Sequence, residues 1–232
     1  MNLKDEKVVV LVSANAEWQA LLPEYPHAKC KNSPFGQYFA AQIDGQDVTF
    51  IKGGWGKISA AASAQYVIDQ WHPKLLINIG TCGGFAGHVE KGEVLLVDKT
   101  IVYDIIEQMG DSAEAIADYT TDIDVSWVGD DLPSNVRKGM LLSADRDILR
   151  EELPRLKDVY QGIAADWESG AIAWVAHRNK TPLLILRGVS DVVSEERAEA
   201  YGGVAVFEAG TRQVMSDLNA QLPYWLAKAA AR

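Results

Sequence analysis

Two acidic residues follow apolar segments that lie close together in the sequence. Glu168 comes shortly after the apolar run 163–165, and Asp191 comes shortly after the longer apolar run 183–189. The residues between them, from about 171 to 179, are typical of a helix. A strand, a helix and a second strand form a βαβ unit, and open α/β sheets bind ligands at the carboxyl ends of their strands. We therefore expect Glu168 and Asp191 to lie together at a ligand site.

The two carboxyl groups are suited to different tasks. Asp191 follows a strand of bulky apolar residues, and burial disfavours the ionised form of a carboxyl group. A carboxyl group that keeps its proton can act as a general acid toward a poor leaving group. Glu168, as a carboxylate, can accept hydrogen bonds from two hydroxyl groups. The structural alternatives are that Asp191 caps a loop and that Glu168 complements a helix dipole.

These acids belong to motifs that resemble the nucleoside phosphorylase and nucleosidase superfamily. Residues 166–173 read DWESGAIA and residues 186–191 read LRGVSD, where the family has E-M-E-(A/G)-x-A-I-A and V-(I/V)-R-x-(I/V)-S-D. Residues 52–57 read KGGWGK and residues 77–84 read INIGTCGG, where the family has K-(S/G)-G-I-G-K and I-N-(T/I)-G-(S/T)-A-G-G. The blocks occur in the family's order and cover nearly the whole chain. The resemblance is closest to the 5′-methylthioadenosine/S-adenosylhomocysteine nucleosidases.

The resemblance implies a role for each of three polar residues. Asp191 would protonate N7 of a purine, and Ser190 would orient that acid. Glu168 would hold the ribose hydroxyls and favour the positive charge that grows on the sugar. The resemblance also places further residues at the substrate, namely Thr81, Cys82, Gly83, Ile148, Trp18, Trp55 and Trp167. The implied reaction is hydrolysis of 5′-methylthioadenosine or S-adenosylhomocysteine to release the free base, in purine and methionine salvage.

The tryptophans at these positions have more than one interpretation. Trp18, Trp55 and Trp167 would stack on a flat base, or narrow the pocket against a bulky 5′ substituent. Each of them taken alone is also compatible with an ordinary core position. The sequence does not choose among these alternatives.

The residue that would activate the attacking water is displaced by one position. The nucleosidases that the chain resembles carry a glutamate in the first loop that hydrogen-bonds this water. An ungapped alignment puts Trp18 there, with Glu17 one residue earlier. Neighbouring residues on a helix point about 100° apart. Glu17 is the candidate base only if the loop has a different shape, and the alternative is a solvent-facing acid in the first turn of a helix.

Features that would bind phosphate are missing. Phosphorylases of the superfamily carry an arginine before the glycine-rich turn and a G-D-P-x-R loop after the first strand. This chain has Asn78 at the first place and the residues SANAEW, 13–18, at the second. Without a cation, phosphate binds poorly, so water is the expected nucleophile. The alternatives are a purine or uridine phosphorylase, and a nucleoside-binding relative without catalysis.

Composition excludes several other classes of protein. The 232 residues, 48% of them hydrophobic, suit one domain spanning residues 1–232, and a net charge of −10 argues against DNA or RNA as a partner. Cys30 and Cys82 form no metal-binding spacing, and we expect neither a metal nor an organic cofactor. Residues 1–7 are too polar for a signal peptide, and no apolar run approaches the ~20 residues of a membrane span. We expect a cytoplasmic protein whose partner is a small nucleoside.

The resemblance also implies that the protein forms a homodimer or larger homo-oligomer, with part of residues 100–130 at the contact between subunits.

The alternation of apolar strands and helices predicts an α/β fold of three layers, α/β/α, with a mostly parallel central sheet. The resemblance adds that this mixed sheet is partly barrel-like. The expected strands are 8–12, 37–42, 47–52, 75–79, 93–97, 99–103, 139–142, 163–165 and 183–189. The expected helices end near Leu22 and span 58–70, 145–153, 171–179 and 205–230. We expect a glycine turn at 80–84 and an irregular segment at 107–135.

Overall fold

The computed structural model describes residues 7–196 and 204–231. The strands are β1 (Val8–Val12), β2 (Lys31–Asn32), β3 (Gln37–Ile43), β4 (Gln46–Lys52), β5 (Leu75–Phe85), β6 (Val94–Val102), β7 (Thr120–Asp122), β8 (Val136–Ser143), β9 (Ala164–Asp166) and β10 (Leu183–Val193). The helices are α1 (Asn15–Leu21), α2 (Gly56–Trp71), α3 (Ala113–Asp118), α4 (Leu153–Asp158), α5 (Ser169–Arg178) and α6 (Val204–Ala230), with 3₁₀ turns η1 (Leu22–Glu24), η2 (Ser126–Val128) and η3 (Arg150–Glu152). Residues 1–6, which belong to the segment expected to be too polar for a signal peptide, lie outside the described part.

The strands form a ten-stranded mixed sheet that closes on itself at one end. Its order is β10-β6-β8-β9-β5-β1-β4-β3-β2, with β7 beside β6. Because β10 also pairs with β5, the path from β10 through β6, β8 and β9 returns to its start as a barrel. The ladders β10–β5 and β6–β8 are parallel, whereas β3–β4 and β10–β6 are antiparallel. The prediction of a mixed, partly barrel-like α/β sheet is confirmed.

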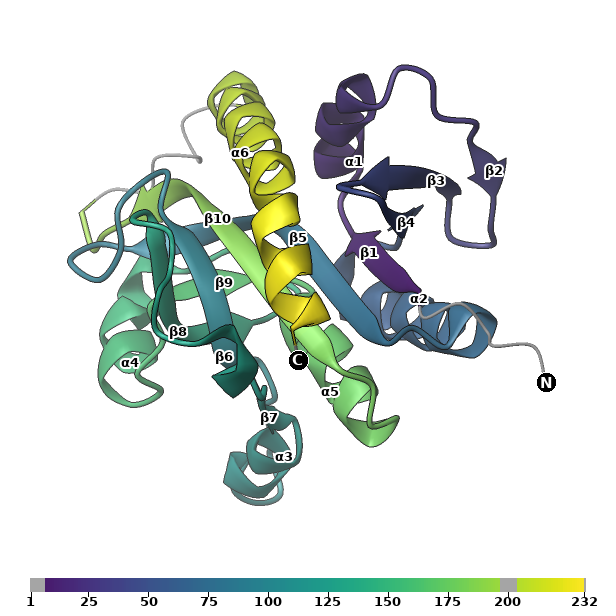
Figure 1. The fold of residues 1–232 in the computed structure, drawn as a ribbon. Coiled ribbons are helices and arrows are strands. Elements are labelled where there is room, and N and C mark those ends of the chain that lie inside the picture. Colours follow the sequence, from purple (N-terminus) through teal and green to yellow (C-terminus); the bar gives the residue numbers. More distant parts are fainter. Residues whose placement is uncertain (1–6, 197–203, 232) are drawn as a thin grey trace.

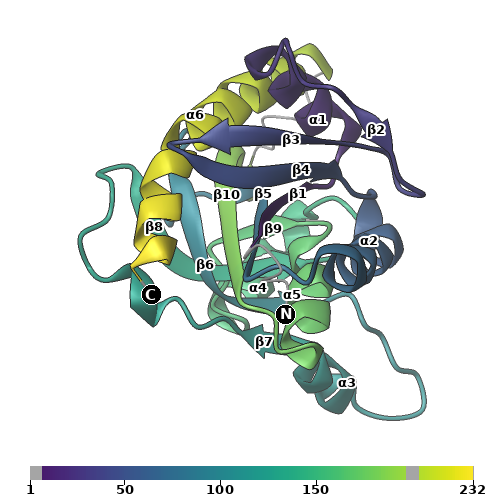
Figure 2. The same cartoon turned by 45° about the vertical axis from the view of Figure 1, so that its right-hand side comes forward.

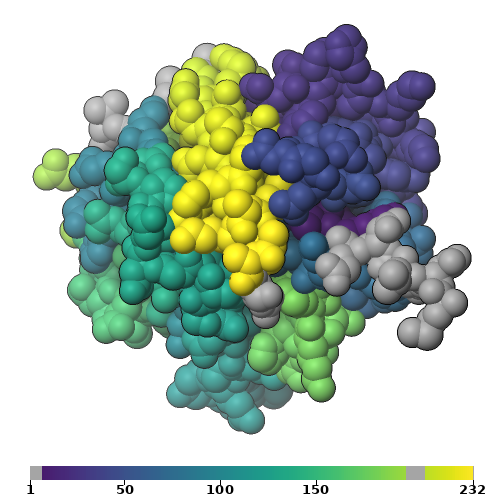
Figure 3. All heavy atoms as spheres, in the orientation of Figure 1, coloured from purple at the N-terminus to yellow at the C-terminus, as the bar shows by residue number. Residues whose placement is uncertain are grey.

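Helices cover the sheet from two sides. Helix α6 crosses in front of β5 and β10 and packs against α1, while α2 and α5 pack against each other on the other side (Figures 1 and 2). In the space-filling view, α6 lies between the N-terminal strands and the β6–β8 part of the barrel (Figure 3). Leu218, Leu222 and Trp225 of α6 are fully buried, so its inner face contributes to the main core. No helix within the described ranges is long and apolar enough to cross a membrane.

Two elements near the expected site differ from the prediction. Residues 80–84 are not a turn, because β5 continues as a strand to Phe85. Ser190 and Asp191 do not end a strand either, because β10 continues to Val193. The two strands pair along this length, with a register shift between Val189 and Asp191. Tertiary pairing therefore keeps extended the residues whose glycine content alone favours a turn.

A glycine of β5 lets neighbouring side chains lie close to the strand backbone and does not form a turn. Gly80 lies beside Arg187 in the β5–β10 register. A Cβ atom at Gly80 would stand 1.8 Å from Nη1 of Arg187 and 2.7 Å from Oε1 of Glu17. A side chain at position 80 would therefore displace the buried charged groups of the site described below.

Three further predictions of elements are wrong in detail. The expected helix 145–153 is absent, and η3 and α4 follow instead, with Pro154 in the first turn of α4, where proline is tolerated. The expected strands 93–97 and 99–103 are one strand, β6. The segment 107–135 contains α3, β7 and η2 and is therefore more regular than expected.

Candidate active site

A cavity of about 440 Å³ lies where β5, β9 and β10 meet the first turns of α1 and α5. Most residues that the sequence placed at a substrate line this cavity, namely Glu17, Trp55, Thr81, Cys82, Gly83, Ile148, Trp167, Glu168, Ser190 and Asp191. The chain thus brings together side chains from six separate segments. The expectation that Glu168 and Asp191 share one site agrees with this arrangement.

Trp18 does not line the cavity, and the expectation that it contacts a ligand is wrong. Its side chain is 1% exposed and packs against Phe39, with ring centroids 5.6 Å apart. Its Nε1 atom donates to Oε1 of Gln37 at 3.4 Å. Helix α1 begins at Asn15, so Glu17 in its first turn faces the cavity and the next residue faces β3. Because neighbouring helical residues point about 100° apart, Glu17 is directed toward the cavity and Trp18 is directed away from it.

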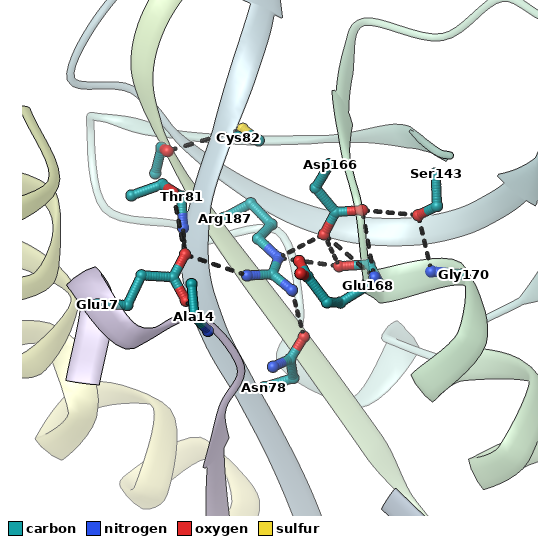
Figure 4. A network of polar contacts seen from close by, with 12 residues as sticks. Ala14, Glu17, Asn78, Thr81, Cys82, Ser143, Asp166, Glu168, Gly170 and Arg187 are labelled. Carbon is teal, nitrogen blue, oxygen red and sulfur yellow. Dashed lines mark hydrogen bonds and ion pairs between the residues drawn. The ribbon is translucent and has the colours of Figure 1, made fainter. Parts of the chain in front are cut away.

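The carboxylate of Glu17 is buried and held by three hydrogen bonds. Oε1 accepts from the backbone N–H of Thr81 at 2.7 Å and from its hydroxyl at 2.9 Å, and Oε2 accepts from the N–H of Ala14 at 3.2 Å. Figure 4 shows this carboxylate beside Thr81, facing the guanidinium of Arg187. The whole residue is 2% exposed. These contacts fix the carboxylate at the edge of the cavity.

Arg187 joins the two halves of the site, and the sequence reading did not single it out. Arg187 is 0% exposed. Its Nε lies 2.9 Å from Oδ2 of Asp166 and donates a hydrogen bond to Oγ of Ser169 at 2.9 Å. Its Nη2 donates a hydrogen bond to Oδ1 of Asn78 at 2.7 Å. Its Nη1 lies 3.8 Å from Oε1 of Glu17 and has no hydrogen-bond acceptor among the described residues. A cationic residue in the middle of a buried strand was the signal available in the sequence, because such a charge must be paired.

Asp166 anchors the turn that leads into α5. Its Oδ1 accepts from the hydroxyl of Ser143 at 2.6 Å, and its Oδ2 accepts from the hydroxyl of Ser169 at 2.5 Å. The Ser143 hydroxyl oxygen in turn accepts from the N–H of Gly170 at 2.8 Å. Figure 4 shows this chain of contacts running from Arg187 to the start of α5. The network fixes the backbone that carries the next acid, Glu168.

Glu168 is buried in the cavity wall and carries an unusual pKa. Its Oε1 accepts from the N–H of Gly56, the first residue of α2, at 3.1 Å. Burial, together with the nearby charge of Asp166, raises the pKa of Glu168 from 4.5 to about 8, and the opposing effects of Arg187 and the Gly56 N–H are smaller. The free site therefore holds a proton on this carboxyl group at neutral pH.

Asp191 lies within β10 and lines the same cavity. Oδ1 of Asp191 accepts from the hydroxyl of Ser190 at 2.7 Å. A register shift lies beside it, an irregularity of the kind that commonly re-aims side chains next to active sites. A Cβ atom at Gly83 would lie 3.9 Å from Oδ2 of Asp191 and 2.7 Å from Cδ1 of Ile148. The absence of a side chain at position 83 thus leaves space for a ligand between the acid and Ile148.

Two tryptophans form another wall. The indole rings of Trp55 and Trp167 are stacked, with centroids 5.3 Å apart and planes 23° apart. Trp55 is 66% exposed, which places it at the mouth of the cavity. On the inner wall Cys82 is buried, and burial raises the pKa of its thiol, which therefore stays uncharged.

Other lining residues were not predicted to contact a ligand, namely Ala14, Arg146, Asp147, Ala165, Asp166 and Phe207. Arg146 pairs with Glu152 at 2.5 Å and lies over the ring of Tyr103 at 5.4 Å. Within the described ranges, no group of three or more His, Cys, Asp or Glu side chains is placed to hold a metal ion.

Comparison with known proteins agrees with this geometry. Residues 7–217 match the model of the phosphorylase superfamily. A 5′-methylthioadenosine/S-adenosylhomocysteine nucleosidase of Maridesulfovibrio salexigens is 27% identical over 92% of this chain and 97% of its own length. The nucleosidase of that name from Marinomonas sp. is 25% identical over 85% of this chain and 86% of its length. The crystal structure of the Colwellia psychrerythraea nucleosidase with adenine shares the fold, with a TM-score of 0.78 at 19% identity, over 99% of this chain and 98% of that one. The chain belongs to the phosphorylase superfamily.

Proposed function

We propose that this protein is a purine nucleosidase that hydrolyses the N-glycosidic bond of 5′-methylthioadenosine and similar 5′-thio nucleosides. The observation that carries the proposal is the placement of three acids on one cavity. Glu17, Glu168 and Asp191 come from three distant segments and line the same space. The relatives named above are nucleosidases of this type, which supports the choice of substrate.

Each acid has a task that its surroundings favour. Asp191, oriented by the Ser190 hydroxyl, protonates the purine and makes it a better leaving group. Hydrogen bonds from the ribose hydroxyls favour the ionised form of Glu168, so that in the complex its carboxylate offers negative charge to the oxocarbenium-like sugar as the bond breaks. Its neighbour Gly56 holds one carboxyl oxygen, so the other remains available to the sugar.

Glu17 prepares the attacking water. Its carboxylate is fixed by Thr81, and Nη1 of Arg187, which has no acceptor among the described residues, lies beside it. A water molecule in the cavity that donates a hydrogen bond to Glu17 loses its proton to this carboxylate as it attacks. The wall that holds Glu17 therefore supplies the nucleophile, and the wall that holds Asp191 supplies the acid.

The same contacts disfavour phosphate as nucleophile. Asn78 stands where phosphorylases have an arginine, and it is 0% exposed. Its side-chain oxygen accepts a hydrogen bond from Arg187, and its side-chain nitrogen donates one to the carbonyl oxygen of Leu11. The N–H and hydroxyl of Thr81, which would suit an anion, are already taken by Glu17. A phosphate ion at this place would face a carboxylate, so hydrolysis is favoured over phosphorolysis. The position of Glu17 also weakens the alternative of a nucleoside-binding protein without catalysis.

A panel of nucleosides tests this proposal. Purified protein is incubated with 5′-methylthioadenosine, adenosine, inosine and uridine in buffer without phosphate, and the free base is measured by chromatography. We expect release of adenine from 5′-methylthioadenosine and no release by the Asp191→Asn variant. Binding of a nucleoside without any base release by the wild type would favour the binding-protein alternative.

We also propose that the protein is a homodimer or larger, with part of residues 100–130 at the contact. Ile106 and Met109 in this segment are 73% and 96% exposed, and Ile58 on α2 is 85% exposed. A contact between subunits at this segment would remove these apolar side chains from water. Light scattering is expected to give at least twice the mass of one chain, and Met109→Glu to reduce it, with Glu114→Lys in the same segment as a control. A fully active monomer would contradict the proposal.

We propose that the protein acts in the cytoplasm, in purine and methionine salvage, because its proposed reaction returns adenine and leaves a methylthio sugar. Fractionation of producing cells tests the location, and recovery from the membranes or the medium would contradict it.

A further inference from the structure

Helix α2 begins beside the acid that is proposed to bind ribose, and two acids from other parts of the chain hold its start. The residue before the helix, Trp55, makes no side-chain hydrogen bond to the first N–H groups, which have no partner within the helix itself. The N–H of Gly56 donates instead to Oε1 of Glu168 at 3.1 Å. The N–H of Lys57 donates to Oδ1 of Asp145 at 2.7 Å. The start of α2 is therefore capped jointly by Glu168 and Asp145.

Asp145 is fixed in turn by a closed ring of contacts with Lys57 and Asp104. The N–H of Asp145 donates to Oδ2 of Asp104 at 2.9 Å. Nζ of Lys57 forms an ion pair with Oδ1 of Asp104 and lies 3.8 Å from Oδ2 of Asp145. Asp104 comes shortly after β6, Asp145 comes shortly after β8, and Lys57 lies in the first turn of α2. These three residues, the Lys57 ring, tie the helix to the ends of two barrel strands.

The backbone of Gly56 makes the start of the helix depend on where Asp145 lies. The φ angle of Gly56 is +78°, a conformation that residues with a side chain rarely adopt. A Cβ atom there would stand 3.0 Å from Oδ1 of Asp145, the oxygen that accepts from Lys57. Gly56 thus lies against Asp145 while its N–H is directed at Glu168. A displacement of Asp145 would therefore move the donor that holds Glu168.

We infer that the Lys57 ring, and Asp145 in particular, positions Glu168 to accept hydrogen bonds from the ribose hydroxyls. None of the three ring residues lines the cavity, so they are positioning residues that act through the N–H of Gly56. That N–H holds one oxygen of Glu168 and leaves the other for the sugar. The direction of the carboxyl group matters, because hydrogen bonds weaken steeply when they are misaligned. This inference rests on the proposed function for the role of Glu168.

The preference for ribose over 2′-deoxyribose measures how well Glu168 is positioned. Isothermal titration in an Asp191→Asn background gives dissociation constants for 5′-methylthioadenosine and its 2′-deoxy analogue without turnover. The ribose compound should bind at least ~10-fold more tightly, because the analogue lacks one hydrogen bond to a carboxylate. Asp145→Ala should reduce this ratio at least ~3-fold, because a displaced donor lets the carboxyl group turn away from the sugar. Asp145→Asn, whose amide oxygen can still accept from the N–H of Lys57, should restore most of the ratio.

A double-mutant cycle and a matched control separate positioning from stability. In a Glu168→Gln background, Asp145→Ala should leave the ratio unchanged, since both changes act through the same side chain. The matched control is Glu93→Ala, because Glu93 makes the same two kinds of contact as Asp145. It accepts from the backbone N–H of Glu90 at 2.8 Å and pairs with Arg137 at 3.3 Å, but it does not line the cavity. Its replacement should leave the preference for ribose unchanged.

Three results would overturn the inference. A lower melting temperature of Asp145→Ala with an unchanged ratio would show that the ring only stabilises α2. An equal loss of the ratio from Asp145→Ala with and without Glu168→Gln would show that the ring does not act through Glu168. The absence of any preference for ribose before these changes would show that Glu168 is not there to be positioned for the sugar. Wild-type protein that releases no base, while the binding ratios change as expected, would contradict the proposed function alone.

Discussion

Nη1 of Arg187 lies 3.8 Å from Oε1 of Glu17, and both side chains are almost fully buried, at 0% and 3% exposed. One comes from the middle of β10 and the other from the first turn of α1. The pair, extended by Asp166 on the other side of the guanidinium, links the strand that carries the acid Asp191 to the helix that carries the proposed base. Stability and chemistry therefore depend on the same buried charges.

Replacing Arg187 by methionine should destabilise the protein strongly. The change leaves Glu17 and Asp166 buried without their cation, which costs about 3–5 kcal/mol when one partner of a buried pair is removed. Urea unfolding followed by circular dichroism measures the loss. Arg178→Met is the control, because Arg178 pairs with Asp118 on the surface, both 54% exposed, and should cost below about 1 kcal/mol. Equal effects of the two changes would contradict the role of Arg187.

Glu17→Gln should lower kcat about 10²-fold or more and leave KM nearly unchanged. The amide keeps an acceptor for Thr81 but cannot take a proton from water. Initial rates of adenine release from 5′-methylthioadenosine measure the effect, and Glu24→Gln on the surface serves as control. Full activity of the Glu17 variant would show that the water is activated by another group.

Asp191→Asn should abolish base release beyond the ~10²–10⁴-fold that is typical of one general acid, because an unprotonated purine is a very poor leaving group. The fold should be retained, since the asparagine can still accept from the Ser190 hydroxyl. Ser190→Ala should cost less, about 10-fold, because it only orients the acid. Rates and melting curves of the two variants check both statements. Near wild-type turnover by Asp191→Asn would exclude its role as the acid.

The raised pKa of Glu168 predicts how stability changes with pH. The unfolded chain loses this proton near pH 4.5, but the folded protein keeps it to about pH 8. Between these values the folded state binds more protons, so the stability from this group is fully present below pH 4.5 and is lost as the pH rises to about 8. Glu168→Gln removes this dependence, so the melting temperature of the variant minus that of the wild type should increase across the interval. The exposed control Glu151→Gln should show a constant difference, and parallel curves for Glu168→Gln would contradict the prediction.

The sequence predicted the architecture and most of the cavity wall because the motifs at 52–57, 77–84 and 166–191 carry both. It could not place the side chains of Trp18 and Glu17, because their directions depend on where α1 begins. A shift of one residue in the start of the helix decides which of the two faces the cavity. It also missed the strand character of residues 80–84, which tertiary pairing with β10 imposes on glycines. The centre of the buried network, Arg187, was visible as a charge within an apolar strand, but its partners Glu17, Asp166 and Asn78 meet only in the folded chain.

The origin of the oxygen that enters the sugar tests the central claim most directly. The protein is incubated with 5′-methylthioadenosine in H₂¹⁸O, with and without added phosphate, and the sugar product is analysed by mass spectrometry. A hydrolase in which Glu17 delivers water gives free methylthioribose with one ¹⁸O, at a rate that phosphate does not change. Formation of the sugar 1-phosphate, or base release that depends on phosphate, would contradict this account.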